Sequence, residues 1–170
     1  CALALADIDR AGLDATAQQA SRFQTKITTD VVDVSCSSAV EAFAGRVEAT
    51  HGAAHILVNN AGVVIAGRFA EQRLEDLEWM FGINYWGVVY GCKLFLPFLL
   101  AEEEAQIVNI SSMFGFVGIP SQISYNASKY AVRGFSEALS SELSGTRVGV
   151  TCVHPGGIRT NVVRASRVSS

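Results

Sequence analysis

The sequence predicts an α/β fold in which helices cover both faces of a parallel sheet. Short apolar runs alternate along the chain with longer segments of helical period. The runs are nearly continuous in Val, Ile, Leu and Ala, which is typical of strands that are buried on both faces. Such alternation favours parallel strands joined by helices, in a doubly wound, three-layer α/β/α arrangement.

The first half of the chain contains three predicted strands and two predicted helices. Apolar runs bounded by polar residues indicate the strands, and apolar residues at helical spacing indicate the helices. In order, they are a strand at 2–7, a helix at 10–20, a strand region at 23–34, a helix at 37–51 and a strand running into a turn at 55–62.

The second half continues the same alternation. It contains a long helical region at about 73–100, a strand at 105–112, a helix at about 123–143, and a strand with a following loop at 147–157. We find no internal repeat, linker or low-complexity tract, so residues 1–170 are expected to form a single domain.

Composition excludes several classes of protein. With 49% hydrophobic and 17% charged residues, the chain of 170 residues has enough apolar material for one sizeable core. A net charge of −3 without a basic block argues against a nucleic-acid partner. The longest apolar run, 87–101, is interrupted by Lys93 and Pro97, so we expect no membrane span. The start of the chain does not resemble a signal peptide, and we expect a cytoplasmic protein.

Neither the cysteines nor the histidines form a recognisable metal or disulfide pattern. The cysteines are widely scattered in apolar or strand-like surroundings, which predicts buried free thiols in a reducing compartment. The histidines lack nearby Cys, Asp and Glu partners, so no metal site is expected. The residues concerned are Cys1, Cys36, Cys92, Cys152, His51, His55 and His154.

Polar residues follow each predicted strand. The carboxyl ends of parallel strands meet at one edge of the sheet, where ligands of such folds bind. Each polar ending also has a simpler interpretation as a helix cap or a turn, but together they predict one site. The endings are Asp7, Asp33 with Val34, "NNAG" at 59–62, Ser111 with Ser112, and "HPGG" at 154–157.

Tyr125 and Lys129 are separated by about one helical turn and therefore share a helix face. The pair alone also fits an ordinary half-buried helix. To exchange a proton near neutral pH, a tyrosine needs its pKa lowered by roughly 3 units, or about 4 kcal/mol. A nearby Lys129 ammonium and a cationic nicotinamide would act in that direction. Ser112 could donate a hydrogen bond to the substrate oxygen, which together suggests an alcohol/carbonyl redox site.

Two further residues suggest roles beside this pair. Asp7 ends the first visible strand, where an acidic residue in a dinucleotide-binding fold accepts hydrogen bonds from the adenine ribose and repels a 2′-phosphate. This favours NAD(H), with NADP(H) less favoured, although Arg10 moderates the preference. Asn84 lies in an apolar helical segment, where it either faces solvent or is buried to hold a water or a backbone group.

In this order and spacing, the motifs resemble those of the short-chain dehydrogenase/reductase family. The matching segments are "NNAG" at 59–62, Asn84 in "GINYWG", "IVNISS" ending at Ser112, Tyr125-x-x-x-Lys129 and "HPGGIRT" at 154–160. The spacing of thirteen between Ser112 and Tyr125 selects Ser112 rather than Ser111. The resemblance covers nearly the whole chain and implies a Rossmann-type fold.

The resemblance also implies roles for individual residues. Asn84, Ser112, Tyr125 and Lys129 would form a catalytic tetrad, with Asn84 anchoring a water in a proton relay that reaches Lys129. Asp7 would hold the adenine ribose. The other cofactor-binding residues would be Asp33 and Val34 at the adenine, Asn60, Ala61 and Gly62 at the cofactor's centre, and Pro155, Gly156, Ile158 and Thr160 at the nicotinamide, with Tyr125 and Lys129 also contacting the cofactor.

Two departures from the family pattern are expected to matter. The glycine-rich T-G-x-x-x-G-I-G turn has no match here, so the pyrophosphate cradle and the first strand, between the 2–7 and 55–62 strands, are expected to be missing. The chain also stops soon after Thr160, before the segment that usually closes over substrate. The leading interpretation is the central portion of an NAD(H)-dependent alcohol/ketone oxidoreductase, and the alternative is a truncated, catalytically silent binding or oligomerisation module.

Partners are inferred in the same way. The resemblance implies a homodimer or homotetramer formed through the helices at about 73–100 and 123–143. The substrate would be a small-molecule alcohol or ketone. The apolar segment "MFGFVGI" at 113–119 suggests that the substrate is hydrophobic, although core packing explains this segment equally well.

Overall fold

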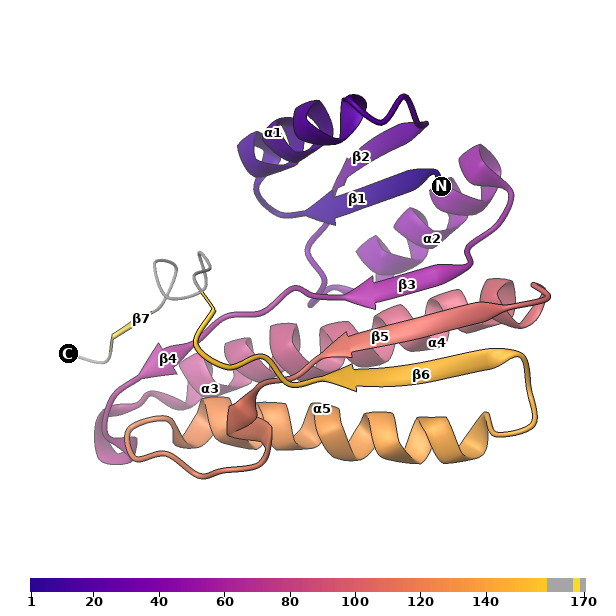
Figure 1. Ribbon diagram of the computed structural model, residues 1–170. Helices are drawn as coiled ribbons and strands as arrows, with labels where there is room; N and C mark the ends of the chain where they lie inside the picture. The colour runs from indigo at the N-terminus through magenta and orange to yellow at the C-terminus, as the bar shows by residue number, and fades with distance from the viewer. Residues whose placement is uncertain (159–166, 169–170) are drawn as a thin grey trace.

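The computed structural model describes residues 1–158 and 167–168 of the chain (Figure 1). The first half contains β1 (Leu3–Asp7), α1 (Arg10–Ser21), β2 (Ile27–Val31), α2 (Ser37–His51) and β3 (Ile56–Asn59). The second half contains β4 (Ile65–Ala66), the 3₁₀-helix η1 (Phe69–Glu71), α3 (Leu74–Phe81), the π-helix η2 (Gly82–Trp86), α4 (Gly87–Leu100), β5 (Ala105–Ile110), the 3₁₀-helix η3 (Met113–Gly115), α5 (Ile123–Glu142), β6 (Val148–Val153) and β7 (Arg167–Val168).

The α/β fold class predicted from the sequence is confirmed, and most element boundaries agree within a few residues. The main difference is the region 23–34, of which only Ile27–Val31 is a strand. The backbone N–H groups of Phe23 and Gln24 donate to the last turn of α1, and Gln24 has a φ of 52°. This left-handed turn prevents an extended backbone there, so the strand begins later than its apolar pattern suggested.

All strand pairs are parallel, and they form separate groups. β1 pairs with β2, while β3, β5 and β6 form a three-stranded sheet in that order (Figure 1). β1 and β3 do not pair, so the predicted interruption of the sheet between these two strands is confirmed. Apolar side chains of β3 next to this interruption are consequently exposed, with Ile56 at 65% and Val58 at 54%. A further short pair joins β4 to β7.

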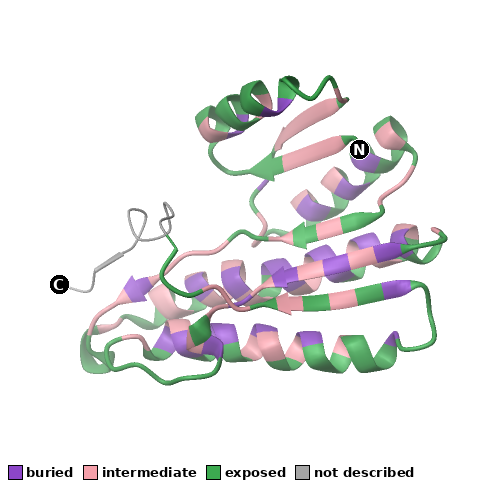
Figure 2. Cartoon of the chain, in the orientation of Figure 1, coloured by how far each residue is buried: buried purple, intermediate pink, exposed green. Residues whose placement is uncertain are grey.

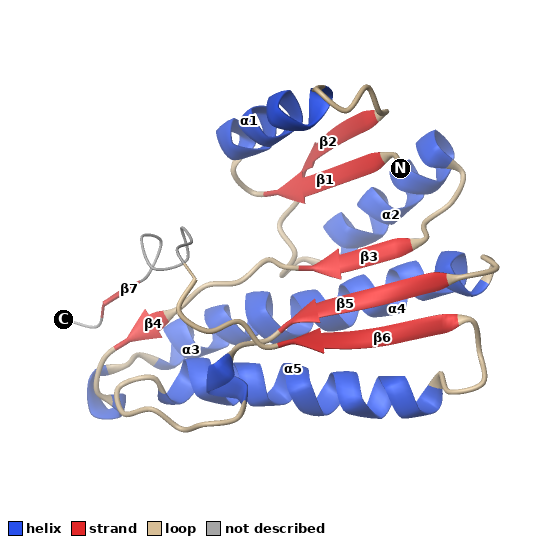
Figure 3. Ribbon diagram, in the orientation of Figure 1, coloured by secondary structure: helices blue, strands red, loops and turns tan. Residues whose placement is uncertain are grey.

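The hydrophobic core lies between the strands and the helices that pack on them. Helices α2 and α4 run side by side behind the strands in Figure 3, and α5 packs along β6. Figure 2 shows buried positions along one side of α2, α4 and α5 and in alternation along β5. Core side chains from these elements include Val40, Ala44, Phe95, Leu99, Ile107, Val132 and Val148.

The continuous helical region Leu74–Leu100 is long and apolar enough to cross a membrane by length and composition alone. Only 39% of its most apolar window is buried inside the protein, but the core helix of a soluble protein passes the same test. Met80 and Leu99 within it have no exposed surface because they pack into the core. This feature is weak evidence, and the absence of a membrane span stays a prediction.

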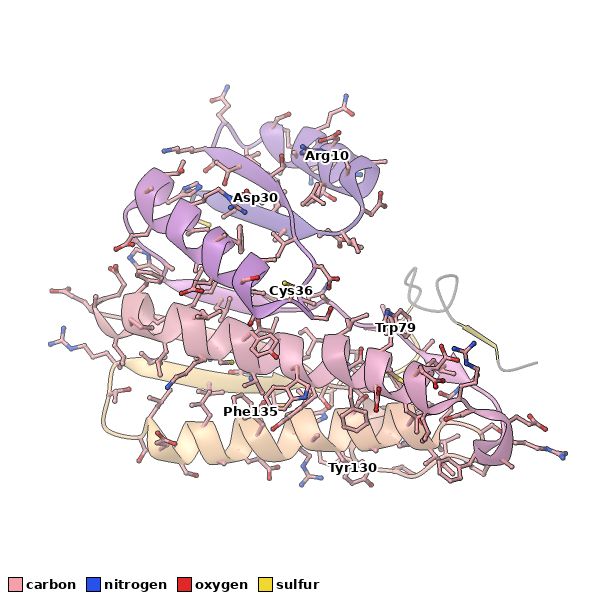
Figure 4. All side chains as sticks on the ribbon, turned by 180° about the vertical axis from the view of Figure 1, so that it is seen from behind. Arg10, Asp30, Cys36, Trp79, Tyr130 and Phe135 are labelled. Carbon is pink, nitrogen blue, oxygen red and sulfur yellow. The ribbon has the colours of Figure 1, made fainter. Side chains whose placement is uncertain are left out.

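The cysteines are only partly as predicted. All four are free thiols, and Cys92 is buried while Cys152 is half-buried. The prediction of burial is wrong for Cys1 and Cys36, which are exposed. Cys36, labelled in Figure 4, directly precedes α2, and its sulfur lies 3.2 Å from the Ser38 hydroxyl oxygen.

A pair of amide side chains, one half-buried and one buried, joins strands β3 and β5 to the helices. Asn59 and Asn109 are register partners on β3 and β5, and Asn59 Nδ2 donates to Asn109 Oδ1 at 2.8 Å. Asn109 Nδ2 in turn donates to the hydroxyl of Ser136 on α5 at 3.0 Å. Gly91 of α4 also approaches the pair, so closely that a Cβ at this position would lie 2.1 Å from Asn59 Oδ1. The missing side chain of Gly91 therefore allows α4 to pack on β3.

We expect Gly91→Ala to lower the free energy of unfolding by about 1–3 kcal/mol, since the added methyl collides with Asn59. Gly45→Ala in α2 is the matched control, because no atom lies within 4 Å of a Cβ at that position. Alanine is the better helix former, so the control should gain about 0.5–1 kcal/mol. Urea unfolding of both variants measures this, and changes of the same sign would contradict the packing argument.

Candidate active site

The carboxyl ends of β3, β5 and β6 point toward the same edge of the sheet (Figure 1). The turn beginning at Asn60 follows β3, Ser111 and Ser112 follow β5, and His154 follows β6. Helix α5 carries Tyr125 and Lys129 to this edge, because it packs on both β6 and the 3₁₀-helix after β5. The structure thus brings the predicted strand-end residues next to the predicted Tyr/Lys pair.

Lys129 is buried, and two hydrogen bonds fix it to the end of β5. Its Nζ donates to the carbonyl oxygen of Ile110 at 2.9 Å, and its own carbonyl oxygen accepts from the Ser111 hydroxyl at 2.9 Å. The side chain is 4% exposed. Burial removes water from the ammonium and lowers the pKa of Lys129 from 10.5 to about 8, although a charged Cys152 thiolate would favour the ammonium. At neutral pH the amine therefore still carries its proton.

Tyr125 lies directly beside this amine. Lys129 Nζ is 5.8 Å from the centre of the Tyr125 ring, and the edge of the Phe114 ring packs on the tyrosine at 5.9 Å between centroids. Burial raises the pKa of Tyr125, and a hydrogen bond with the Ser112 hydroxyl opposes this. The expected lowering of this pKa is therefore wrong for the chain's own residues, because desolvation of the phenol by burial outweighs the Ser112 hydrogen bond.

The two serines at the end of β5 point to different partners. Ser112 has an extended backbone with a φ of −165°. Its hydroxyl lies within hydrogen-bond reach of the Tyr125 phenol and also accepts the Phe114 N–H at 3.2 Å. Ser111 is buried, and its hydroxyl is used by the Lys129 carbonyl oxygen. The geometry therefore favours Ser112 over Ser111 as the serine next to a reacting group.

Asn84 lies inside the π-helix and is completely buried. Its Oδ1 accepts the Val63 N–H at 2.8 Å, and its Nδ2 donates to the Val63 carbonyl oxygen at 2.9 Å and to the Ser128 hydroxyl at 3.1 Å. Of the two interpretations of Asn84, the buried one is correct, and the group it holds is the backbone after the "NNAG" turn. Both amide hydrogens are used, so a water could bind this side chain only through Oδ1.

Gly62 lies between Asn84 and Lys129. A Cβ at this position would lie 3.4 Å from Asn84 Oδ1 and 3.5 Å from Lys129 Nζ. The glycine thus leaves the approach to the lysine open. Asn60 and Ala61, in the same turn, are exposed and line a cavity of about 120 Å³ together with Asp7 and Val34. Part of this cavity is the interruption between β1 and β3, because core residues such as Phe43 and Phe95 also line it.

The remaining predicted residues lie around the same edge. Asp7 is exposed, and its carboxylate accepts the Asp9 N–H at 2.9 Å. Asp33 is exposed, and its carboxylate accepts from the N–H and the hydroxyl of Ser35. Pro155, Gly156 and Ile158 follow β6, and a Cβ at Gly156 would lie 3.1 Å from Met113 Sδ. Thr160 lies outside the described residues. Among the described residues, no three metal-ligating side chains cluster, and the absence of a metal stays a prediction.

Two buried side chains near the site, Ser128 and Asn126, were not predicted, whereas His154 belongs to the predicted "HPGG" strand ending. Ser128 links Asn84 to the backbone of Tyr125, since its hydroxyl donates to the Tyr125 carbonyl oxygen at 2.8 Å. His154 Nδ1 lies 3.1 Å from the Ser112 carbonyl oxygen and donates to it. Asn126 bonds the loop that follows Ser112. Their positions in the sequence could have indicated these residues, because each is a polar residue close to a motif residue within an otherwise apolar or helical segment.

Comparison with known proteins agrees with this geometry. The family model described as short chain dehydrogenase matches residues 1–169. The chain belongs to the short-chain dehydrogenase family.

Individual members of this family are similar over most of the chain. "Putative oxidoreductase SadH" from Mycobacterium tuberculosis is 44% identical over 169 residues, which are 98% of this chain and 61% of that protein. A short chain dehydrogenase/reductase from Burkholderia phymatum, solved in complex with NAD, is 35% identical with a TM-score of 0.92 over 95% of this chain and 59% of that chain. An alcohol dehydrogenase from Thermococcus sibiricus, complexed with 5-hydroxy-NADP, is 25% identical with a TM-score of 0.90 over 97% of this chain and 69% of that chain.

The chain covers only part of the length of these relatives. The chain spans about 61% of the length of the curated relative that it matches. One of these similar structures was solved in complex with NAD and the other with 5-hydroxy-NADP.

The buried amine of Lys129 should leave a signature in the pH dependence of stability. Lys129 binds its proton more weakly in the folded chain than in the unfolded one, so the unfolded state holds more protons between pH 8 and 10.5. Its contribution therefore makes stability rise with pH in this window, and the cost of burying the ammonium is fully present below pH 8. The difference between the two pKa values corresponds to about 3 kcal/mol.

Lys129→Met isolates this contribution. In the protein that carries this chain, the free energy of unfolding of the unsubstituted form minus that of the variant should increase by about 3 kcal/mol from pH 7.5 to 10.5. Denaturant unfolding at several pH values measures it, and other titrating groups cancel in the difference. A difference independent of pH would show that the ammonium is well solvated.

Proposed function

We propose that this chain carries the catalytic part of an NAD(H)-dependent oxidoreductase that transfers a hydride between the cofactor and an alcohol or ketone. One observation carries the proposal. The Ser112 hydroxyl, the Tyr125 phenol and the buried Lys129 ammonium lie together at the carboxyl edge of a parallel sheet. A hydroxyl, a phenol and an ammonium in this order suit proton transfer to and from a carbonyl oxygen.

Residues at this edge would hold the adenosine and nicotinamide ends of a dinucleotide, while the glycine-rich pyrophosphate turn has no match in the chain. Asp7, Val34, Asn60 and Ala61 border one cavity, and Gly62 leaves room for a ligand to approach Lys129 closely. In the proposed complex, Asp7 would bind the adenine ribose hydroxyls, while Lys129 and the segment 155–158 would lie at the nicotinamide end. The bound nicotinamide would supply or accept the hydride.

The chain's own residues would handle the proton and the developing charge. When a ketone is reduced, the carbonyl carbon gains a hydride and its oxygen gains a proton, which Tyr125 would donate. In the reverse direction the phenolate of Tyr125 would take the proton from the alcohol. The Ser112 hydroxyl would donate a hydrogen bond to the same oxygen, where negative charge develops in the transition state.

The pKa shifts are compatible with these roles. Burial raises the pKa of Tyr125, so the phenol holds its proton at neutral pH and is ready to act as the acid in reduction. Lys129, with a pKa of about 8, is mainly an ammonium at neutral pH and would stabilise the phenolate that remains after proton donation. Asn84 and Ser128 would act indirectly, because they fix the turn at Val63 and the backbone of Tyr125.

Tyr125→Phe removes the proton donor while keeping the ring. In the protein that carries this chain, it should lower kcat for ketone reduction by about 10²–10⁴-fold and leave NADH binding largely unchanged. Tyr130→Phe, at an exposed tyrosine of the same helix (Figure 4), is the matched control and should retain full activity. Undiminished turnover by Tyr125→Phe would refute the proton-transfer role. No turnover by the unsubstituted protein would favour the silent binding module.

Asp7 is the residue proposed to select NAD(H). Asp7→Ser removes the carboxylate that would repel a 2′-phosphate, so the ratio of kcat/KM for NADH to that for NADPH should fall about tenfold or more, since a hydrogen bond to a charged group contributes about 1.5–3 kcal/mol. Asp14→Ser, at an exposed aspartate of α1, is the control with the same change in charge. Steady-state kinetics with both cofactors give the ratio, and equal ratios in all three proteins would exclude the ribose assignment.

A further inference from the structure

Asn126 is a buried polar residue that directly follows Tyr125 on α5. Its side chain makes three hydrogen bonds, all to the backbone of the loop that follows Ser112. Nδ2 donates to the carbonyl oxygens of Phe114 at 2.8 Å and Val117 at 2.6 Å, and Oδ1 accepts the N–H of Ile119 at 3.1 Å. One side chain on a rigid helix thus holds the loop at three points along six residues.

The loop held in this way exposes apolar side chains. Met113 is 54% exposed, Phe116 48%, Val117 52% and Ile119 36%. Figure 2 shows the segment between β5 and α5 as largely exposed. The sequence left open whether "MFGFVGI" packs in the core or meets a ligand, and four of its seven residues are exposed in this chain rather than packed in its core. A contiguous exposed apolar segment of this kind indicates a binding surface.

The loop is also joined to the site on both sides. The ring of Phe114 packs against Tyr125, and the N–H of Met113 donates to the Pro155 carbonyl oxygen at 3.0 Å. The ring of Phe116 lies 4.2 Å from that of His154, which itself bonds the Ser112 carbonyl oxygen. The apolar surface therefore borders the two side chains, Ser112 and Tyr125, proposed to contact the reacting oxygen.

Most of the loop's other hydrogen bonds join backbone groups. Its internal hydrogen bonds run from Gly115 N–H to the Ser112 carbonyl oxygen and from Phe116 and Val117 N–H to that of Met113, and they form one tight turn. Farther along, the Gln122 N–H donates to the Ile119 carbonyl oxygen at 3.2 Å, while Asn126 bonds both the Val117 carbonyl oxygen and the Ile119 N–H. Because Asn126 adjoins Tyr125, the same turn of α5 sets the position of the proposed acid and of the apolar surface.

We propose that Asn126 is a positioning residue that fixes residues 113–119 as an apolar surface for substrates with a bulky apolar group beside the carbonyl. This inference rests on the proposed function and specifies its substrate class. A small ketone reaches only Ser112 and Tyr125. A ketone with a large apolar substituent also covers the loop, so its binding depends on the loop being held in place.

The kinetic test compares butan-2-one with 4-phenylbutan-2-one as substrates and NADH as reductant, in the protein that carries this chain. Asn126→Ala removes all three hydrogen bonds. Asn126→Asp keeps the acceptor for Ile119 but replaces both donations by repulsion from two carbonyl oxygens. Ala127→Ser, at the exposed neighbouring position, is the control. Both Asn126 variants should raise KM for 4-phenylbutan-2-one about tenfold or more, and change kcat and KM for butan-2-one and KM for NADH less than about threefold.

Hydrogen exchange of residues 113–122, read by mass spectrometry, tests the loop without any turnover. Both Asn126 variants should exchange faster there than the unsubstituted protein, whereas Ala127→Ser should not. Equal losses with the two ketones, or unchanged KM for 4-phenylbutan-2-one, would overturn the specificity role, and unchanged exchange would overturn the positioning role. Absence of turnover by the unsubstituted protein would instead refute the proposed function, and the exchange measurement would still decide whether Asn126 holds the loop.

Discussion

The reciprocal link between Lys129 and the end of β5 is the constraint on which the site depends. The Lys129 ammonium donates to the Ile110 carbonyl oxygen, and the next residue, Ser111, donates its hydroxyl to the Lys129 carbonyl oxygen. Two bonds in opposite directions fix both the rotation of α5 about its axis and its position along β5. The positions of Tyr125 and Asn126 on α5 therefore depend on this contact. A buried cation is an unusual means of attachment, because desolvation opposes it.

A second layer of buried polar contacts supports this link. Asn84, Ser128 and Val63 connect the π-helix, α5 and the turn after β3, while Asn59, Asn109 and Ser136 connect β3, β5 and α5. Such networks are stable only when their members are satisfied. The strand ends and helices are therefore positioned relative to one another by hydrogen bonds of amide side chains, which are directional, as well as by apolar packing.

Much of this arrangement is predictable from sequence because it follows periodicity and strand ends. The α/β class, the order of elements and the convergence of Ser112, Tyr125 and Lys129 follow from patterns that depend on nearest neighbours along the chain. Other features depend on contacts between distant residues. The sequence indicated that Asn84 needs a partner but not that Val63 supplies it, and the π-helix around Asn84 has no signal in a helical apolar pattern. The direction of the Tyr125 pKa shift was missed because it depends on how deeply the ring is buried in the folded chain.

Burial shifts the pKa values of Lys129 and Tyr125 in opposite directions. It favours the neutral form of both, lowering the pKa of Lys129 to about 8 and raising that of Tyr125. With both groups moved toward neutrality, the protein alone does not make Tyr125 a base at neutral pH. The proposed reaction therefore requires additional positive charge near the phenol when the alcohol is oxidised, whereas reduction of a ketone begins from the protonated phenol that burial already favours. In this site the desolvation that lowers the pKa of Lys129 therefore also keeps the phenol of Tyr125 protonated at neutral pH in the chain alone.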